Sequence, residues 1–522
     1  MRRVALGFNA TFPTPISSAG SAAVRLGWNL VAGLAGSGWT AVVGVLVTPF
    51  YIHLLGIESY GLIGFFTTLL TLLQLLDLGL SPTMNREVAR HVSAVDAPRL
   101  RHLLRSLELL YWIVALTMAM ALLLTAGWLG RNWLHSKHLA VVDVVQAVML
   151  MGLVAAARWP TGLYASCLMG AQRLALVSGL SIVMVTFGAL GSIFLLAFIS
   201  PSVNVFFLWQ LLVSLVHVVL IRWFAWNAVG GSKGASFKLA ELHRIWRFSA
   251  GVGAIAVTGV ILMQFDKVLL SRLVGLSEYG RYMLATLLAS GFYLIATPMF
   301  NALYPRFSAL VAIGQFERLL ELYGLATRLL ATLAFSLAFA VAIHTEALIR
   351  LWTHDPLLSA QVAPIASILI LAAALHAVLF LQYALQLAYG KARVALLLNL
   401  ILLIIYVPSS IFLTIEHAGS GAAIAWLLLQ CVYLGLGTFI TERYLLTGHA
   451  GRWLIMDVGI PLCISLGVAW VVSEVEPAGM VGIKALIWTG VTMTAAALLS
   501  LSFASGLRTS LYESLQFKKN RT

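Results

Sequence analysis

Long apolar stretches separated by short polar ones dominate the pattern of this sequence. Each stretch extends over about 20 residues, the length that an α-helix needs to cross the hydrocarbon core of a bilayer. Transmembrane β-strands would instead alternate over about ten residues. The pattern therefore predicts about fourteen membrane-spanning helices. We expect them at residues 26–53, 60–82, 107–129, 141–165, 174–200, 203–225, 248–274, 279–304, 322–344, 360–387, 393–415, 419–441, 454–473 and 480–505.

The composition agrees with this assignment and excludes an ordinary soluble protein. Of 522 residues, 61% are hydrophobic and only 10% are charged, and the mean hydropathy is +0.96. Soluble domains are about 25% charged. Cys167, Cys431 and Cys463 all fall within predicted helices, at spacings that indicate neither a disulfide nor a zinc site. The expected fold class is an all-α integral membrane protein.

Most of the 33 Lys and Arg residues lie in alternate connections between the predicted helices. Because short loops rich in Lys and Arg stay in the cytoplasm, both termini are expected there. Residues 1–24 show no signal-peptide pattern, so no processing is expected. The net charge of +14 follows these loops rather than one contiguous face. This distribution favours charges that set the topology and also contact anionic phospholipid, and it argues against a nucleic-acid partner.

Three matches at nearly one spacing indicate an internal repeat. "LLGIESYGLIGFFTTLL" resembles "LVGLSEYGRYMLATLLA", which places Gly61 219 positions before Gly280 (280 minus 61). "MGAQRLAL" resembles "YGKARVAL" at a spacing of 220, and Arg86 and Arg306 are also 220 positions apart (306 minus 86). Since each match falls on corresponding helix boundaries, the sequence predicts duplicated halves.

Six helices in each half is an even number, so the two copies would be parallel repeats around an axis along the membrane normal. Such halves characteristically enclose a pathway and expose it alternately to each face. The last two helices lie outside the duplication. The expected organisation is a cytoplasmic tail at 1–24, a first six-helix bundle at 25–225, a basic cytoplasmic linker at 226–247, a second six-helix bundle at 248–445, accessory helices at 446–507 and a basic cytoplasmic tail at 508–522.

Three segments carry a resemblance to a known family. They are "LLGIESYGLIGFFTTLLTLLQLLDLGLSPTMNREVAR", "GAQR" and "MQFDKVLLSRLVGLSEYGRYMLATLLAS". These resemble the polysaccharide-transport, or O-antigen flippase, family of bacteria, in the MOP superfamily that also contains the MATE multidrug antiporters and lipid II flippases. The resemblance covers most of the first twelve predicted helices. It implies two six-helix bundles that form a V-shaped central cavity.

The resemblance also implies a function. It is that of a flippase in the bacterial cytoplasmic (inner) membrane, which moves undecaprenyl-diphosphate-linked oligosaccharide to the periplasmic leaflet for O-antigen, capsule or exopolysaccharide assembly. Other membrane proteins of polysaccharide assembly would be its partners. No cofactor and no metal are expected, and coupling would use H+ or Na+.

Charges inside the predicted helices are the candidate site residues, because each costs at least about 2.5–3.5 kcal/mol at the centre of a membrane helix and should face a cavity. Arg158 lies about 22 Å along its helix from Asp143, and Pro160 and Gly162 follow it. We expect Arg158 to face the cavity and bind the diphosphate. The alternative is a structural ion pair, for example with Asp77.

Asp77 and Asp266 are candidate carboxylates for coupling or for structure. Asp77 could be a protonatable site, or it could make a hydrogen bond between helices or a pair with an arginine. Asp266 precedes Lys267, and neighbours on a helix point about 100° apart, so each is expected to have a different partner. Lys267 could bind substrate as a cavity cation or reach the periplasmic interface.

Arg328 lies near the cytoplasmic end of a predicted helix, where the equivalent position of the first half has Glu108. Substrate binding in the cavity and extension to the interface are both open for its side chain. Arg86 and Arg306 close the second and eighth predicted helices, and we expect them at the cytoplasmic mouth of the cavity.

Enzyme functions have little support in this sequence. It contains no "GxxxxGK[ST]" phosphate loop and shows no nucleophile or metal-ligand pattern. Two alternatives remain open: an ion-coupled antiporter of small molecules or drugs from the same superfamily, and a membrane-embedded glycan polymerase or ligase. The second typically carries a large periplasmic loop with Arg and His, whereas the longest hydrophilic loops here, 83–106 and 226–247, are expected in the cytoplasm.

Overall fold

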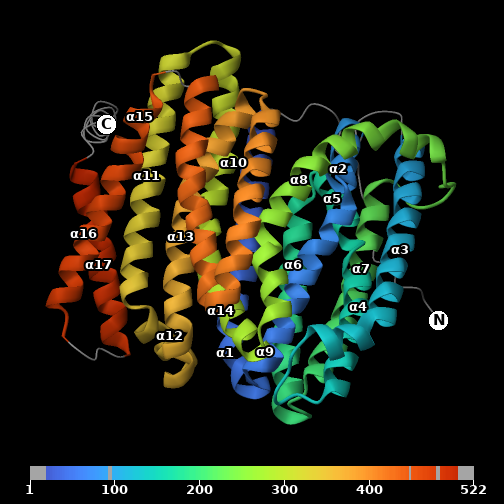
Figure 1. Cartoon of the computed structure of the whole chain (residues 1–522). Coiled ribbons are helices and arrows are strands. Elements are labelled where there is room, and N and C mark those ends of the chain that lie inside the picture. Colours follow the sequence, from blue (N-terminus) through green and yellow to red (C-terminus); the bar gives the residue numbers. More distant parts are fainter. Residues whose placement is uncertain (1–18, 92–96, 446–447, 478–481, 504–522) are drawn as a thin grey trace.

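The computed structural model describes residues 19–91, 97–445, 448–477 and 482–503, and nearly all of them are helical (Figure 1). The prediction of an all-α fold is therefore confirmed. The elements are α1 (Ala19–Leu73), η1 (Gln74–Asp77), α2 (Leu80–His91), α3 (Ala97–Trp128), η2 (Leu129–Trp133), α4 (Val141–Arg158), α5 (Thr161–Gly170), α6 (Leu174–Phe198), α7 (Val203–Ala228), α8 (Leu239–Leu273), α9 (Leu276–Ser290), α10 (Tyr293–Ala312), α11 (Phe316–Ile343), α12 (Thr345–Thr353), α13 (Pro356–Ala388), α14 (Ala392–Tyr444), α15 (Ala450–Arg452), η3 (Trp453–Gly459), α16 (Ile460–Val475) and α17 (Ile483–Ser502).

The length and apolarity of these helices make the chain a multi-pass membrane protein. Ten helical segments in the described ranges could cross a membrane, or eleven if the bent pair α9 and α10 is counted as one span. Two of the ten, α1 and α14, each consist of two helices that meet at a residue with non-helical backbone angles, Gly56 and Ala418 respectively. The predicted number of fourteen spans and the repeat symmetry stay predictions.

Short-range hydrogen bonds explain where some of these helices begin. At the start of α7, the hydroxyl of Ser202 accepts a hydrogen bond from the backbone N–H of Asn204 at 3.3 Å. At the start of α13, the carboxylate of Asp355 accepts one from the N–H of Leu358 at 3.0 Å, and Pro356 occupies the first turn. Both arrangements satisfy backbone groups that a helix leaves without an internal partner.

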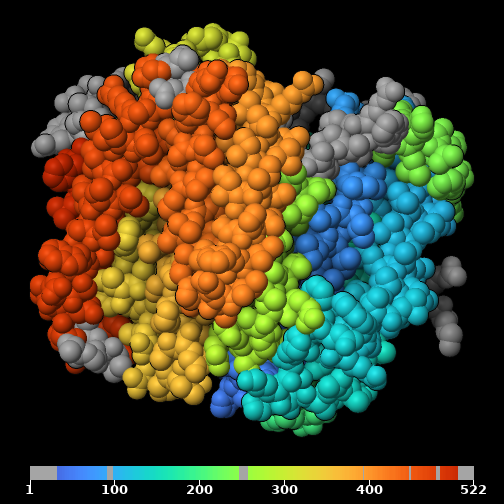
Figure 2. All heavy atoms as spheres, in the orientation of Figure 1, coloured from blue at the N-terminus to red at the C-terminus, as the bar shows by residue number. Residues whose placement is uncertain are grey.

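The helices form two groups that lie side by side (Figure 1). One group contains α2 to α7, and the other contains α10, α11, α13 and α14, with α16 and α17 on its outer side. The second segment of α1 packs against α9 where the groups meet. In Figure 2 a yellow-green surface, the colour of α8 and α9, lies between the orange surface of the second group and the blue and cyan surface of the first group.

An interrupted helix leads into each group. In the first, the predicted helix over 60–82 is not continuous, because α1 ends at Leu73 and α2 begins at Leu80. In the second, α9 ends at Ser290 and α10 begins at Tyr293, with a bend of 41° between them. The first interruption contains two residues with positive φ, and it shapes the cavity described below.

The short helix α12 has no counterpart among the predicted spans. It contains nine residues, far fewer than the roughly 20 that a membrane crossing requires. The indole Nε1 of Trp352 on α12 donates a hydrogen bond to the carbonyl oxygen of Val45 on α1 at 3.1 Å. This helix therefore joins the second group to the first segment of α1.

Candidate functional site

A cavity of about 1090 Å3 lies between α1, α8 and helices of the first group. Its walls come from both segments of α1, the junction of η1 with α2, the junction of α4 with α5, α6, α7 and the middle of α8. Apolar side chains such as Val47, Phe66 and Leu70 form much of the lining, and a few polar side chains lie among them. Ligand sites commonly combine a mainly apolar concave wall with a few convergent polar groups.

Asp77 lies at the cavity wall and stabilises the interruption between α1 and α2. After Asp77 the chain passes through Leu78 and Gly79, which have positive φ values of 46° and 78°. The Asp77 carboxylate then accepts hydrogen bonds from the backbone N–H of Ser81 at 3.2 Å and from its hydroxyl at 2.8 Å. It thereby satisfies a backbone donor in the first turn of α2 that has no partner within the helix.

The hydroxyl of Tyr111 on α3 also donates to the Asp77 carboxylate. Asp77 therefore makes a hydrogen bond between helices, which is one of the roles that the sequence left open for it. The same hydroxyl lies 3.0 Å from that of Ser81. These contacts explain an aspartate in an apolar segment: its carboxylate caps the start of α2 after the break and links this segment to α3.

Arg158 is the last residue of α4 and lines the same cavity. Pro160 and Thr161 follow, and the hydroxyl of Thr161 donates a hydrogen bond to the carbonyl oxygen of Arg158. In a continuous helix, that oxygen would accept a hydrogen bond from a backbone N–H of the next turn. Pro160 has no N–H to continue the α4 ladder. The helix is therefore interrupted beside Arg158, between the end of α4 and the start of α5.

The two helix breaks lie next to each other. The indole Nε1 of Trp159 donates to the carbonyl oxygen of Leu73, the last residue of α1, at 3.3 Å. The Trp159 ring stacks on the Tyr111 ring with a centroid distance of 4.4 Å. Backbone that leaves helical geometry inside a membrane is tolerated where it is buried in protein or lines a cavity, and both breaks line this one.

The partners of Arg158 are neutral. Its Nε donates to the hydroxyl of Ser214 at 2.9 Å and its Nη2 donates to the amide oxygen of Gln210 at 2.5 Å, both on α7. Its guanidinium carbon lies 5.6 Å from the centre of the Phe66 ring. Among the described residues, no carboxylate lies within ion-pair distance of Arg158. The alternative of an ion pair with Asp77 is therefore wrong, because Asp77 is engaged with Tyr111 and Ser81.

Gln210 is itself held in place by a second contact. Its amide nitrogen donates to the hydroxyl of Ser192 on α6 at 3.1 Å. This fixes which end of the amide faces Arg158. Sequence reasoning did not select Gln210, Ser214 or Ser192, although a glutamine in an apolar predicted helix is the kind of signal that marks a polar cavity.

Asp266 and Lys267 lie in α8, outside the residues that line the cavity. The expectation of separate partners is wrong: the Nζ of Lys267 lies 3.1 Å from the Oδ1 of Asp266. The long lysine side chain bends back along the helix, where its ammonium also donates to the carbonyl oxygen of Met263 at 2.8 Å. The Asp266 carboxylate, 2% exposed, accepts a further hydrogen bond from the hydroxyl of Tyr282 on α9.

Arg328 faces the accessory helices rather than the cavity. Its Nε and Nη2 donate to the Oδ1 of Asp457 at 2.9 and 2.6 Å, which joins α11 to η3. Arg86 is half-buried on α2, and Arg306 is exposed on α10. Neither residue is among those that line the cavity. Of the predicted site residues, the structure therefore brings Asp77 and Arg158 together at one cavity, and the others lie elsewhere.

Comparison with known proteins identifies the family. A family model described as "Polysaccharide biosynthesis protein" matches residues 27–311, which is more than half of the chain. The chain belongs to this polysaccharide biosynthesis protein family. No curated protein matches it.

Solved structures with this fold are transporters and a lipid flippase of the MOP superfamily. An inward-facing multidrug resistance MATE family transporter is 15% identical, with a TM-score of 0.65 over 80% of this chain and 99% of that one. The lipid II flippase MurJ in an inward closed conformation is 11% identical, with a TM-score of 0.66 over 94% of this chain and 99% of that one. An outward-facing MATE family transporter is 15% identical, with a TM-score of 0.58 over 82% of this chain and 95% of that one. The chain therefore shares the fold of these transporters and of this flippase.

Proposed function

We propose that this protein is a flippase that moves a lipid-linked oligosaccharide with an undecaprenyl-diphosphate carrier across the bacterial inner membrane, by alternating access. One observation carries the proposal: Arg158 presents a cation to a large cavity inside the membrane protein, and its hydrogen-bond partners there are neutral. A buried charge without a counter-ion is costly. A diphosphate entering the cavity would supply the missing negative charge.

The chemistry of the cavity fits a diphosphate headgroup. The guanidinium of arginine offers five N–H donors in a planar fork, and the hydrogen bonds to Ser214 and Gln210 use two of them. Other donors remain for phosphate oxygens, which arginine binds in bidentate geometry. The low-polarity wall around Phe66 and Leu70 would strengthen that attraction, since charges interact more strongly where water is excluded.

His217 adds a second polar group to the same wall. Its Nε2 is buried and has no hydrogen-bond partner among the described residues. Buried polar atoms normally have partners, so a sugar hydroxyl could satisfy this nitrogen in the loaded protein. The cavity volume of about 1090 Å3 slightly exceeds the range for ligand pockets, about 300–1,000 Å3. Such a space suits a headgroup, while the polyprenyl chain would remain in the membrane.

The family supports the proposed process, and the shared fold supports the proposed mechanism. Polysaccharide biosynthesis is the family's description. Structures of MATE transporters with this fold include an inward-facing and an outward-facing state, as alternating access requires. In this proposal both termini are cytoplasmic, coupling uses H+ or Na+, no cofactor takes part, and other membrane proteins of polysaccharide assembly are partners.

A reconstitution experiment tests the proposed function. The purified protein would be placed in liposomes containing undecaprenyl-diphosphate oligosaccharide, and the glycan that becomes accessible on the opposite leaflet would be measured with a membrane-impermeant glycosidase. Transfer should require the protein and should fall in Arg158→Ala. If the protein instead exports cationic drugs in exchange for ions, and leaves the glycolipid distribution unchanged, the proposal is wrong and the antiporter alternative replaces it.

A further inference from the structure

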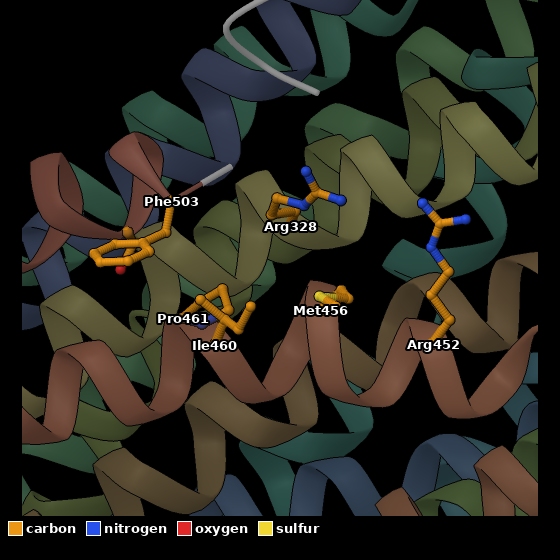
Figure 3. A pocket seen from close by; sticks show the side chains of 7 residues that line it. Arg328, Arg452, Met456, Ile460, Pro461 and Phe503 are labelled. Carbon is orange, nitrogen blue, oxygen red and sulfur yellow. The ribbon is translucent and has the colours of Figure 1, made fainter. Parts of the chain in front are cut away.

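A second pocket lies outside the cavity, between α11 and the accessory helices (Figure 3). Its volume is about 150 Å3, and its lining comes from Arg328 on α11, from the segment Arg452–Pro461 and from the end of α17 at Ser500 and Phe503. Figure 3 shows the side chains of Arg328 and Arg452 coming from two different helices, with Phe503 at the opposite end of the pocket from Arg452. The function proposed above uses none of these residues.

The two arginines give this pocket a positive charge. The Nε and Nη2 of Arg328 both donate to one oxygen of Asp457. Arg452 is exposed at the start of η3, and among the described residues no carboxylate lies within 4.0 Å of its guanidinium nitrogens. Two guanidinium groups therefore share one nearby carboxylate, which leaves one positive charge for an anion from outside the protein.

An unsatisfied hydroxyl points to a ligand independently of the charges. Ser500 on α17 is 1% exposed and lines the pocket. Its Oγ has no hydrogen-bond partner among the described residues. Several serines in these membrane helices bond back to a carbonyl of the previous turn, as Ser502 does to Leu499 at 2.7 Å. An oxygen-rich ligand in the pocket would satisfy the hydroxyl of Ser500.

The rim of the pocket is apolar and exposed. Met456 is 47% exposed and Phe503 is 68% exposed. In a membrane protein, such side chains face lipid chains. Arg452 belongs to the segment that the charge pattern predicts at the cytoplasmic surface, where acidic lipids attract basic residues. The pocket therefore combines cations and a hydroxyl donor with an adjoining surface for acyl chains.

We propose that this pocket binds the phosphate group of an acidic phospholipid, held by Arg328, Arg452 and Ser500, with an acyl chain along Met456 and Phe503. The lipid would join α11 to the accessory helices α16 and α17. A free phosphate has the same headgroup chemistry but gains nothing from the apolar rim. The site is separate from the cavity, so this proposal does not depend on the flippase function.

The test measures thermal unfolding of the full chain in neutral detergent, with added phosphatidylglycerol, phosphatidylcholine or inorganic phosphate. Phosphatidylglycerol should raise the melting temperature more than phosphatidylcholine does. Arg452→Gln should remove at least half of that difference, and Ser500→Ala should reduce it less. Because Arg328→Gln alone would leave Asp457 unpaired, Arg328→Gln is combined with Asp457→Asn, and this double variant should also lose the difference.

Arg318→Gln is the matched control, because Arg318 is an exposed arginine on the same helix as Arg328 and lies outside the pocket. It should respond to phosphatidylglycerol as the unmodified protein does. An equal response in Arg452→Gln and in the double variant would overturn the site. A loss of the response in Arg318→Gln as large as in Arg452→Gln would show a diffuse charge effect and overturn it too. If inorganic phosphate gave the full response, the lipid assignment would be wrong.

Discussion

Gly61 on α1 and Gly280 on α9 pack against each other so closely that neither position has room for a side chain. A Cβ atom on Gly61 would lie 2.5 Å from the carbonyl oxygen of Leu276, and one on Gly280 would lie 2.4 Å from the carbonyl oxygen of Ile57. The contact is reciprocal, because Ile57 and Leu276 stand at the same 219 spacing as the two glycines. Two halves related by a two-fold axis would meet in this way.

Gly61→Ala and Gly280→Ala should therefore push the two helix groups apart. Each added methyl group meets backbone rather than a movable side chain, so we expect a loss of about 1–3 kcal/mol in the free energy of unfolding. Gly44→Ala, at a position of α1 where a Cβ would meet nothing within 4 Å, should leave the stability unchanged or slightly raised. Thermal unfolding of the three variants checks this. Equal stability of Gly61→Ala and Gly44→Ala would contradict the close contact.

Arg158→Ala should reduce glycolipid transfer at least tenfold while the protein remains folded, since Gln210 retains its bond to Ser192. Arg158→Lys should restore part of the transfer, because a point charge keeps the attraction but loses the bidentate geometry. The readouts are transfer in liposomes and the melting temperature. Normal transfer by a stable Arg158→Ala protein would disprove the binding role.

Asp77→Ala should lower stability by about 0.5–2 kcal/mol, as loss of a helix cap does. Because Asp77 and Arg158 have separate partners, their effects on stability should add in the double variant. Denaturation of both single variants and the double variant measures this. A double variant more stable than Asp77→Ala would indicate an ion pair that the structure lacks.

Gln210→Glu should block transport without unfolding the protein. The new carboxylate would lie where the amide oxygen now accepts from Arg158 at 2.5 Å, and it would neutralise the cation that the diphosphate requires. We expect a loss of transfer similar to that of Arg158→Ala, with an unchanged or higher melting temperature. Ser214→Ala keeps the charge of the site and serves as the control. Transfer at the unmodified level in Gln210→Glu would show that the charge of Arg158 is not used.

Asp266→Asn should destabilise the protein by about 3–5 kcal/mol, because it leaves the ammonium of Lys267 buried without its counter-ion. Combining it with Lys267→Met should recover most of that loss. If Asp266 also couples transport to H+, the double variant should transfer glycolipid with no response to a pH gradient. Thermal unfolding and transfer under an imposed gradient separate the two roles. A single variant as stable as the unmodified protein would show that the pair is unimportant.

Labels that cannot cross the membrane should reach a cysteine at Gly234 only from the cytoplasm and one at His354 only from the periplasm. The expectation rests on the basic loops, and α12 lies at the end of the molecule opposite the connection between α7 and α8 (Figure 1). Labelling in intact and permeabilised cells measures it. A further predicted cytoplasmic label, at Ala94, lies outside the described residues. Labelling of Gly234 in intact cells would reverse the topology and reopen the polymerase alternative.

The sequence by itself determined the all-α membrane class, most helix positions and the place of Arg158 inside a segment long and apolar enough to span a membrane. These depend on properties that act locally: a run of apolar residues must be helical to bond its backbone in lipid, and a charge far from both interfaces needs a cavity or a partner. Pro160 likewise indicated the break after Arg158, since proline lacks the N–H of the helical ladder.

Only the tertiary structure decided which side chains meet. Gln210 and Ser214 reach Arg158 across 52 and 56 positions of the chain, and periodicity on one helix says nothing of the rotation of another. Asp457 lies 129 positions from Arg328 and pairs with it, on a helix that does not line the cavity. Lys267 bends back onto Asp266 because a flexible four-carbon chain can reach positions that the direction of its Cβ does not suggest. The contacts of Arg158 and Arg328 depend on packing between helices that are distant along the chain, which the periodicity of a single helix does not predict.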